Sequence, residues 1–338
     1  MTIRSLTPLN RGDVVRLRHT STSLANNPWG DPVTRDVAVY LPPGFDRGLN
    51  SNLPLLVSLA GYTSSGLAHV NWRAFEESLP ERLDRLIDAG AMGPAVVMFP
   101  DCFTSLGGNQ YVNSPALGNY SDYLLNELIP LVEAQFQTDP ARRAVFGKSS
   151  GGYGALMFAM RNPGYFAAVA SHAGDVGFET LFRPAFPEVA TTLRDCQGDL
   201  TRFIKRFWGA KKVGGGDVTA LMICGMAASF DPDPSQPLGF CLPFDLHTCQ
   251  LDQARWRRWL DHDPLNALER SHKALLGLKK LYIDVGTRDE YHMQYGSRLL
   301  HARLDALGVV HHYEEFDGSH SGIDHRLDLS LTQLYGAI

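Results

Sequence analysis

The feature that most constrains this chain is a glycine-rich turn around Ser149. Residues 144–146 form a short apolar run typical of a buried strand, and residues 155–160 place apolar side chains at helical spacing. The pattern Gly147-x-Ser149-x-Gly151 therefore lies where a strand turns into a helix. Such a turn needs small flanking residues and holds the serine hydroxyl outward, beside the free N–H groups of the helix. The sequence predicts that Ser149 is a nucleophile at this turn.

Two other interpretations of the turn have to be weighed. Gly147-Lys148-Ser149 could end a phosphate-binding P-loop, but that motif needs a glycine five residues before Gly147, where this chain has Arg142. The other alternative is a strand–turn–helix joint without chemistry, which the pattern alone does not exclude. A nucleophilic serine of this kind needs an acid and then a histidine later in the chain, so those two residues decide between the alternatives.

The acid candidate follows the strand-like segment 280–286. Asp289 lies in the turn after this segment, and Glu290 is its rival one residue further on. Asp284 lies inside the segment and is expected to face the packing of the sheet. Since parallel strands end at one edge of an open sheet, Asp289 is expected on the same edge as Ser149.

The histidine candidate is His320, one of twelve histidines in the chain. It lies in the small-residue loop 317–322, after the strand-like segment 310–316. His311 and His312 lie within that segment and are expected to pack structurally. His172 follows the strand-like segment 166–171 and is expected beside the site at most. The order serine, acid, histidine fits the requirement set by the turn.

An oxyanion hole needs two backbone N–H groups. One donor is expected from Ser150, the residue after the nucleophile, and the other from the loop after an early central strand. That strand is the apolar run 55–59, so the second donor is expected to be the N–H of Tyr62. The candidate pocket residues are Gly61, Tyr111, His172 and Lys148.

Strand-like and helical segments alternate along most of the chain. This order predicts an α/β protein with a mostly parallel, doubly wound sheet. Residues 1–175 and 273–338 are expected to form this core, and residues 176–272 a helical insertion rich in Phe, Trp and Met. The insertion either packs its own apolar core or forms a cap over Ser149, with side chains such as Phe207 and Phe230 in the pocket wall; the two interpretations are compatible.

The chain resembles the putative esterase family of α/β hydrolases, which includes esterase D, feruloyl esterases and enterochelin-type esterases. The resemblance covers most of the chain outside about a hundred middle residues. It rests on sequence blocks in the family's order: residues 37–45, 59–61, 108–114, 127–130, 147–156, 286–289 and 318–320.

The resemblance implies an α/β-hydrolase fold with Ser149 as nucleophile, Asp289 as acid and His320 as base. The chain departs from the family in the early loop, where Ala60-Gly61 replaces the usual His-Gly. Esterase D proteins carry a cysteine in this loop, whereas this chain has Tyr62-Thr63-Ser64, which counts against glutathione thioesters as substrates.

Composition and charge limit the partners and the cellular compartment that we expect for this chain. A net charge of −5 without long charge runs argues against nucleic acid or an anionic membrane as partner. The first residues start no apolar signal core, and the five cysteines show no C-x-x-C spacing, so a cytoplasmic protein is expected. No metal or organic cofactor is expected. The sequence does not decide whether the chain forms a homodimer.

These observations together predict a serine carboxylesterase that acts on small-molecule esters. Two alternatives remain: an acyltransferase that uses an alcohol in place of water, and a non-catalytic binding relative of the same fold.

Overall fold

The computed structural model describes residues 10–46 and 52–338, and its centre is an eight-stranded sheet. The strand order is β1-β2-β4-β3-β7-β8-β9-β10. The first two strands join antiparallel, whereas β4, β3, β7, β8, β9 and β10 run parallel. Their bounds are β1 Asp13–Thr20, β2 Thr34–Leu41, β3 Leu55–Leu59, β4 Val96–Pro100, β7 Arg143–Lys148, β8 Ala168–His172, β9 Lys280–Gly286 and β10 His312–Phe316. The prediction of a mostly parallel doubly wound sheet is confirmed.

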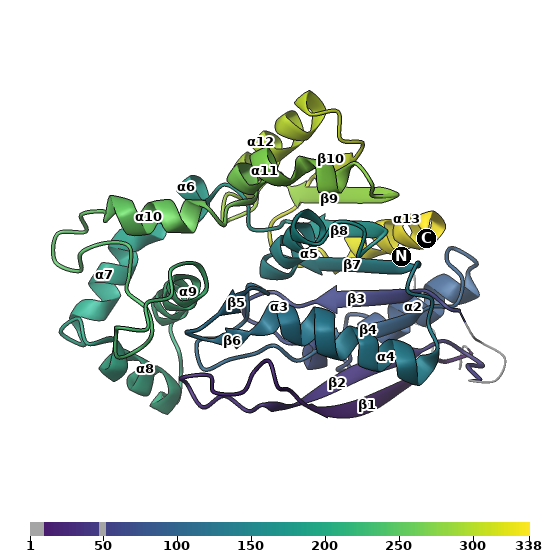
Figure 1. Cartoon of the computed structure of the whole chain (residues 1–338), viewed down its shortest axis with the longest axis horizontal. Helices are drawn as coiled ribbons and strands as arrows, with labels where there is room; N and C mark the ends of the chain where they lie inside the picture. Colours follow the sequence, from purple (N-terminus) through teal and green to yellow (C-terminus); the bar gives the residue numbers. More distant parts are fainter. Residues whose placement is uncertain (1–9, 47–51) are drawn as a thin grey trace.

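Helices cover both faces of the sheet (Figure 1). The central strands β3, β7 and β8 are buried on both faces, as parallel strands in such folds are. One face packs against α1 (Gly66–His69), α2 (Leu79–Asp88) and α13 (Leu327–Ala337), which follows the short helix η3 (Asp324–Arg326). The other face packs against α4 (Ile129–Phe136), α5 (Ser150–Arg161) and α12 (Met293–Ala306).

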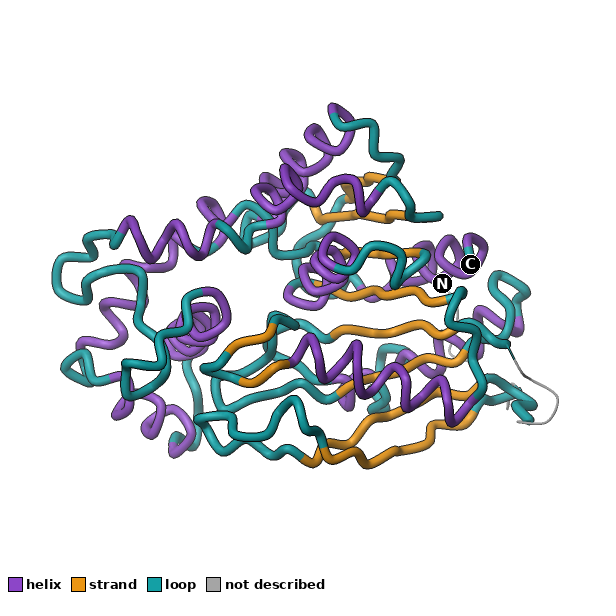
Figure 2. Tube along the Cα trace, viewed as in Figure 1, coloured by secondary structure: helices purple, strands orange, loops and turns teal. Residues whose placement is uncertain are grey.

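Residues 176–272 contain helices and loops but none of the strands of the sheet (Figure 2). The helices are α6 (Phe178–Leu181), η2 (Arg183–Ala185), α7 (Phe186–Arg194), α8 (Leu200–Gly209), α9 (Gly215–Phe230), α10 (Gln253–Leu260) and α11 (Pro264–Leu275). An aromatic cluster holds them together, in which Phe178, Phe182, Phe230 and Trp259 contact one another mostly edge to face. Helix α11 packs against α5 and α12, so the end of this segment belongs to the packing of the core.

The sequence pattern predicts one helix over residues 74–88 and another over residues 120–136, and the structure differs from both predictions for identifiable reasons. The helix expected over residues 74–88 begins only at Leu79, because Ser78 caps it and exchanges hydrogen bonds with Glu81. The helix expected over residues 120–136 is divided into α3 (Tyr120–Asp122), a π-helical turn η1 (Tyr123–Leu128) and α4. Pro130 near the start of α4 has no N–H to donate to the preceding turn, which favours a local change of helical pitch.

A two-stranded ribbon, β5 (Asn113–Ser114) with β6 (Gly118–Asn119), precedes α3. The five cysteines are free thiols. No helix among the described residues is long and apolar enough to span a membrane.

Candidate active site

Ser149 lies at the turn between β7 and α5 with φ 56° and ψ −126°. An L-residue adopts this conformation only where the surrounding structure forces it. The neighbouring glycines show why the turn is forced: a Cβ on Gly147 would lie 2.5 Å from the backbone of Gly151, and one on Gly151 would lie 2.1 Å from Leu59 O. The predicted strand–turn–helix geometry is therefore present, and close backbone packing explains its glycines.

The structure brings His320 and Asp289 together. Nδ1 of His320 lies 2.7 Å from Oδ2 of Asp289, and both residues are buried. A neutral imidazole that donates Nδ1–H to a carboxylate keeps its Nε2 lone pair free. Tyr291 covers the imidazole edge-on, with 4.9 Å between ring centroids.

Glu290 contacts a different part of the same histidine. Its Oε2 accepts a hydrogen bond of 2.8 Å from the backbone N–H of His320. Asp289 contacts the imidazole while Glu290 holds the main chain, so the two rival acids have separate positions in the site.

The loops that carry the acid and the histidine are bound to each other. Thr287 N donates to Phe316 O, and Arg288 N donates to Gly318 O, both at 2.9 Å. At Gly286 a Cβ would lie 2.6 Å from Gly318 O, so only glycine permits this approach. This local packing at the ends of β9 and β10 sets the distance between Asp289 and His320.

Asp175 is a site residue that the sequence reasoning missed. It follows β8, and its Oδ1 accepts a hydrogen bond of 3.4 Å from Ser149 Oγ. Its Oδ2 accepts hydrogen bonds from Ser150 Oγ at 3.1 Å and Gln110 Nε2 at 3.2 Å. Burial raises the pKa of this carboxyl to about 6, against the opposing effect of the nearby His320. Between Ser149 and His320 the described residues show no hydrogen bond, so the serine hydroxyl points to Asp175.

Tyr62 and Ser150, the two predicted donors, both lie at the cavity beside Ser149. No hydrogen bond among the described residues uses the backbone N–H of either residue. The Tyr62 loop is fixed on both sides: Gly108 N donates to Tyr62 O at 2.7 Å, and Tyr111 OH donates to Ala60 O at 2.6 Å. Tyr62 and Ser150 are the residues whose N–H groups were predicted to form an oxyanion hole, and both lie beside the cavity.

A cavity of about 350 Å³ joins these groups. Ser149, His320, Tyr62 and Ser150 line it from the core. The helical segment contributes the apolar side chains Leu181, Phe182, Val218 and Met222, together with Thr219. A cavity of this size accommodates a small-molecule ester.

Of the four candidate pocket residues, Gly61 and Lys148 line this cavity, whereas Tyr111 and His172 do not. Tyr111 is buried and supports the Tyr62 loop through its hydrogen bond to Ala60 O. His172 is buried in a polar network, with Nδ1 2.6 Å from Asp284 Oδ1 and Nε2 2.8 Å from Ser330 Oγ. The placement of these two residues in the pocket is corrected accordingly.

The two aromatic residues expected in the pocket wall also lie elsewhere. Phe230 is buried in the aromatic cluster, where it packs on Tyr153 and Phe178. Phe207 packs on Phe203 and Trp208. The wall consists instead of Leu181, Phe182, Val218 and Met222, which the composition of the segment did not distinguish from its core.

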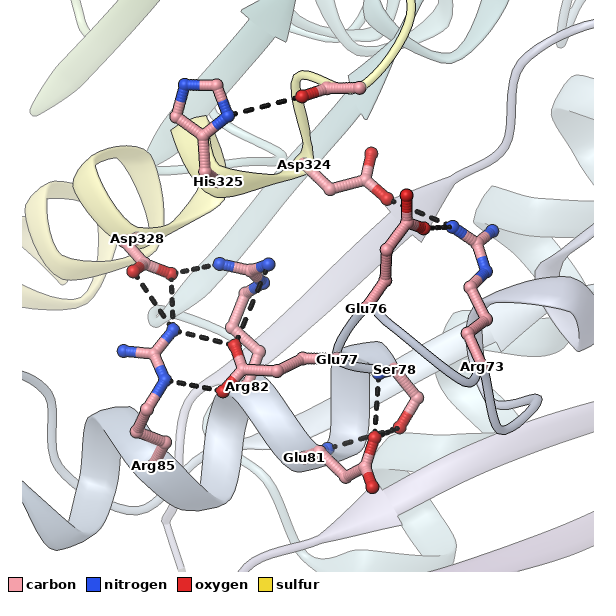
Figure 3. A network of polar contacts seen from close by, with 11 residues as sticks. Arg73, Glu76, Glu77, Ser78, Glu81, Arg82, Arg85, Asp324, His325 and Asp328 are labelled. Atoms are coloured by element: carbon pink, nitrogen blue, oxygen red, sulfur yellow. Dashed lines mark hydrogen bonds and ion pairs between the residues drawn. The ribbon is translucent and has the colours of Figure 1, made fainter. Parts of the chain in front are cut away.

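A network of ion pairs borders the cavity on the side of α2 and α13 (Figure 3). Arg73 pairs with Glu76 at 2.6 Å and with Asp324 at 3.3 Å. Arg82 pairs with Asp328, and its NH2 lies 3.7 Å from Glu77. These guanidinium groups thus have carboxylate partners within the protein.

The amino-acid sequence is similar to that of known esterases. The model of the family described as "Putative esterase" matches residues 32–334. The chain belongs to this family. S-formylglutathione hydrolase of Mus musculus is 33% identical over 144 residues, which are 40% of this chain and 50% of that protein. The chain therefore matches only about half the length of this curated relative.

Solved structures share the fold over nearly the whole chain. A ferulic acid esterase superposes with a TM-score of 0.62 at 16% identity, covering 97% of this chain and 99% of that one. An S-formylglutathione hydrolase from Agrobacterium tumefaciens gives a TM-score of 0.61 at 17% identity, covering 100% and 99%. These esterases have the α/β-hydrolase fold, which confirms the predicted fold of this chain.

Proposed function

We propose that this protein is a serine carboxylesterase with Ser149 as nucleophile, His320 as base and Asp289 as the acid that orients the base. The observation that carries the proposal is that Ser149, at a strained strand-to-helix turn, lines the same cavity as a His320 bonded to a buried Asp289. Membership in an esterase family supports it.

The first step forms an acyl-enzyme. Rotation about the Ser149 Cα–Cβ bond turns the hydroxyl from Asp175 to Nε2 of His320, which takes its proton as Oγ attacks the ester carbonyl. The N–H groups of Tyr62 and Ser150 stabilise the oxyanion, and each such donor is worth about 3 kcal/mol in comparable sites. The imidazolium then protonates the departing alcohol.

The second step releases the acid. His320 accepts a proton from water, whose oxygen attacks the acyl carbonyl, and then returns a proton to Ser149 Oγ. Throughout, Asp289 holds the imidazole in one tautomer and stabilises its charged form. This chemistry uses only side chains and backbone groups of the chain.

The test is covalent labelling followed by turnover. A fluorophosphonate probe should modify Ser149, identified by peptide mapping, and Ser149→Ala should fold normally but lose nearly all hydrolysis of 4-nitrophenyl acetate. A fully active Ser149→Ala variant would contradict the proposal. Labelling that requires Ser149 also excludes a non-catalytic binding relative.

A further inference from the structure

Lys148 is the last residue of β7 and directly precedes Ser149. Its side chain lines the cavity together with Ser58, His69, Phe146 and Leu327, and this part of the cavity is called the lysine compartment below. Phe146 and Lys148 point to the same face of the sheet because side chains alternate along a strand. Ser58 lies beside Phe146 in the register of β3 and β7. The compartment therefore lies next to the nucleophile and is built on rigid strands.

Among the described residues the ammonium group of Lys148 has neither an ion pair nor a hydrogen bond, and only longer-range charges act on it. Asp324, Asp289 and Glu290 act on it only at longer range, and burial lowers its pKa. The other cations of the cavity wall, Arg73 and Arg82, are held by carboxylates, as Figure 3 shows. A partly buried ammonium without a direct partner has lost part of its hydration, and a bound anion compensates for that loss.

Ser58 and His69, the other polar residues of the lysine compartment, are neutral, whereas Asp324, which also lines the cavity, is paired with Arg73 at 3.3 Å. Burial lowers the pKa of His69 to about 4, so its imidazole carries no charge at neutral pH, and its Nδ1 lies 3.0 Å from Ser58 Oγ. This pair offers hydrogen bonds without adding charge. Lys148 is thus the group in the compartment that favours a negatively charged ligand.

We propose that the lysine compartment binds an anionic group, such as a carboxylate, of the ester substrate. This inference rests on the proposed esterase function. It adds the class of substrate: an ester whose acyl or alcohol part carries a negative charge close to the scissile bond. An ammonium–carboxylate hydrogen bond inside a cavity is worth about tenfold or more in affinity.

The test compares matched anionic and neutral esters. Mono-4-nitrophenyl succinate is compared with the neutral 4-nitrophenyl 4-methylpentanoate for the acyl side, and 3-carboxyphenyl acetate with 3-methylphenyl acetate for the alcohol side. The ratio of kcat/KM, anionic to neutral, should fall about tenfold or more in Lys148→Met for one of the two pairs. Lys148→Arg keeps the charge and should retain most of the ratio, which separates charge recognition from packing.

Two outcomes separate the inference from the proposed function. If the wild type hydrolyses neutral esters and Lys148→Met changes neither ratio, the anionic site is wrong and the esterase stands. If no ester is hydrolysed, the esterase proposal fails. The inference is then decided by calorimetric binding of N-phenylsuccinamic acid, which should be weaker in Lys148→Met; equal binding would overturn it.

A second and independent observation is the cluster of His301, Asp305 and His311, none of which lines the cavity. His301 and Asp305 lie one turn apart on α12, and His311 lies just before β10. One ligand atom of each residue lies within 4.8 Å of the other two. Two imidazoles and a carboxylate are a common ligand set for Zn²⁺.

The imidazole rings of His301 and His311 are held in fixed orientations by their neighbours, as is typical of metal ligands. Nδ1–H of His311 donates to Val309 O at 2.8 Å, so its Nε2 carries a lone pair, which accepts a hydrogen bond of 2.8 Å from Nδ1–H of His301. The His311 side chain is only 2% exposed. The ring of His301 stacks on Tyr313 with centroids 4.3 Å apart. A backbone carbonyl that fixes the tautomer of a histidine is typical of metal ligands.

We infer that His301, Asp305 and His311 bind a divalent zinc-type ion, with solvent in the fourth position beside the exposed Asp305. The ion would link the end of α12 to the start of β10, the two elements that connect Asp289 with His320. Small side-chain rotations bring the three atoms to bonding distance, and the ion replaces the proton shared by the two imidazoles.

The experiment uses the full chain after removal of metal with EDTA. Calorimetry should show one Zn²⁺ bound per chain, Co²⁺ should give visible absorption bands, and Mg²⁺ should not bind. His311→Gln and His301→Gln should each abolish Zn²⁺ binding, whereas the exposed His247→Gln should keep it. Absence of Zn²⁺ binding by the wild type, or equal binding by His311→Gln, would overturn the site.

Discussion

Asp289 and Glu290 are neighbours whose contacts with His320 predict different effects. Asp289→Asn should lower kcat on the order of 10⁴-fold, because an amide cannot hold the imidazole in the working tautomer or stabilise its charged form. Glu290→Gln keeps an oxygen that accepts from His320 N, so its cost should be about tenfold at most. Steady-state kinetics on 4-nitrophenyl acetate checks the ranking. If Glu290→Gln proves the more damaging change, Glu290 is the acid.

Asp175 is expected to make stability depend on pH. Its folded pKa of about 6 lies above the usual value near 4, so the fold favours the neutral acid. The stability that this group contributes is complete below about pH 4 and is lost as the pH rises through 6. Asn mimics the neutral acid, so Asp175→Asn should be more stable than the wild type at pH 8, on the order of 2 kcal/mol.

Urea unfolding at pH 4 and pH 8 provides the measurement and its own control. The difference between Asp175→Asn and the wild type should close at pH 4, where both carry a neutral side chain at this position. A difference that is absent at pH 8, or larger at pH 4, would show that burial does not raise the pKa of Asp175. The neighbouring His320 is present in both proteins and contributes to both curves.

The sequence identified Ser149, Asp289 and His320 as candidates because each follows a strand in a small-residue loop. Asp175 follows β8 in the same way, and β8 lies between β7 and β9, so the same rule could have found it. Side-chain direction was harder to predict. Tyr111 and His172 bind Ala60 O and Asp284, and these partners, 51 and 112 residues away, appear only in three dimensions.

At the scale of elements, the turn that presents Ser149 depends on backbone contact between β3, β7 and α5. Gly151→Ala places a methyl group 2.1 Å from Leu59 O, a clash with backbone that no side-chain rotation relieves. The expected loss is about 3 kcal/mol of unfolding free energy. Activity should fall as well, because the turn would move with α5.

The matched control is Gly336→Ala in α13, where an added Cβ meets no atom within 4 Å. Alanine is the better helix former by up to about 1 kcal/mol, so this variant should be equally or more stable. Thermal unfolding of both variants against the wild type checks the contrast. Equal stability of the wild type and Gly151→Ala would mean that the turn tolerates a side chain.

The ends of strands could be predicted from sequence patterns more accurately than the ends of helices. Strands were predicted to within a few residues because apolar runs in a parallel sheet are bounded by turns. The start of α2 required the side-chain exchange between Ser78 and Glu81 to be recognised as a capping box. The π-helical turn at Tyr123–Leu128 depends on Pro130 and on tertiary packing, which apolar periodicity does not encode.

At the scale of the whole molecule, the order of the strands brings the site together. β7, β8 and β9 are neighbours and β10 follows β9, so the loops after these four strands share one edge of the sheet. The sequence predicted this convergence without any contact being known. The sequence allowed a cap over Ser149 from residues 176–272, but it did not distinguish Phe182, which lines the cavity, from Phe207 and Phe230, which do not.

Residues 176–272 should select substrates by the length of their acyl chain. The side chains of Leu181, Phe182, Val218 and Met222 face the cavity, so they should set acyl-chain preference without taking part in the chemistry. Met222→Ala removes several atoms from the wall and should raise kcat/KM for 4-nitrophenyl octanoate relative to the acetate about tenfold, whereas Val218→Trp should lower the same ratio. Phe230→Leu is the control, since Phe230 is buried in the aromatic cluster and should lower the melting temperature without changing the ratio. If Met222→Ala and Phe230→Leu scale all chain lengths equally, the segment acts only through stability and does not form a wall of the substrate site.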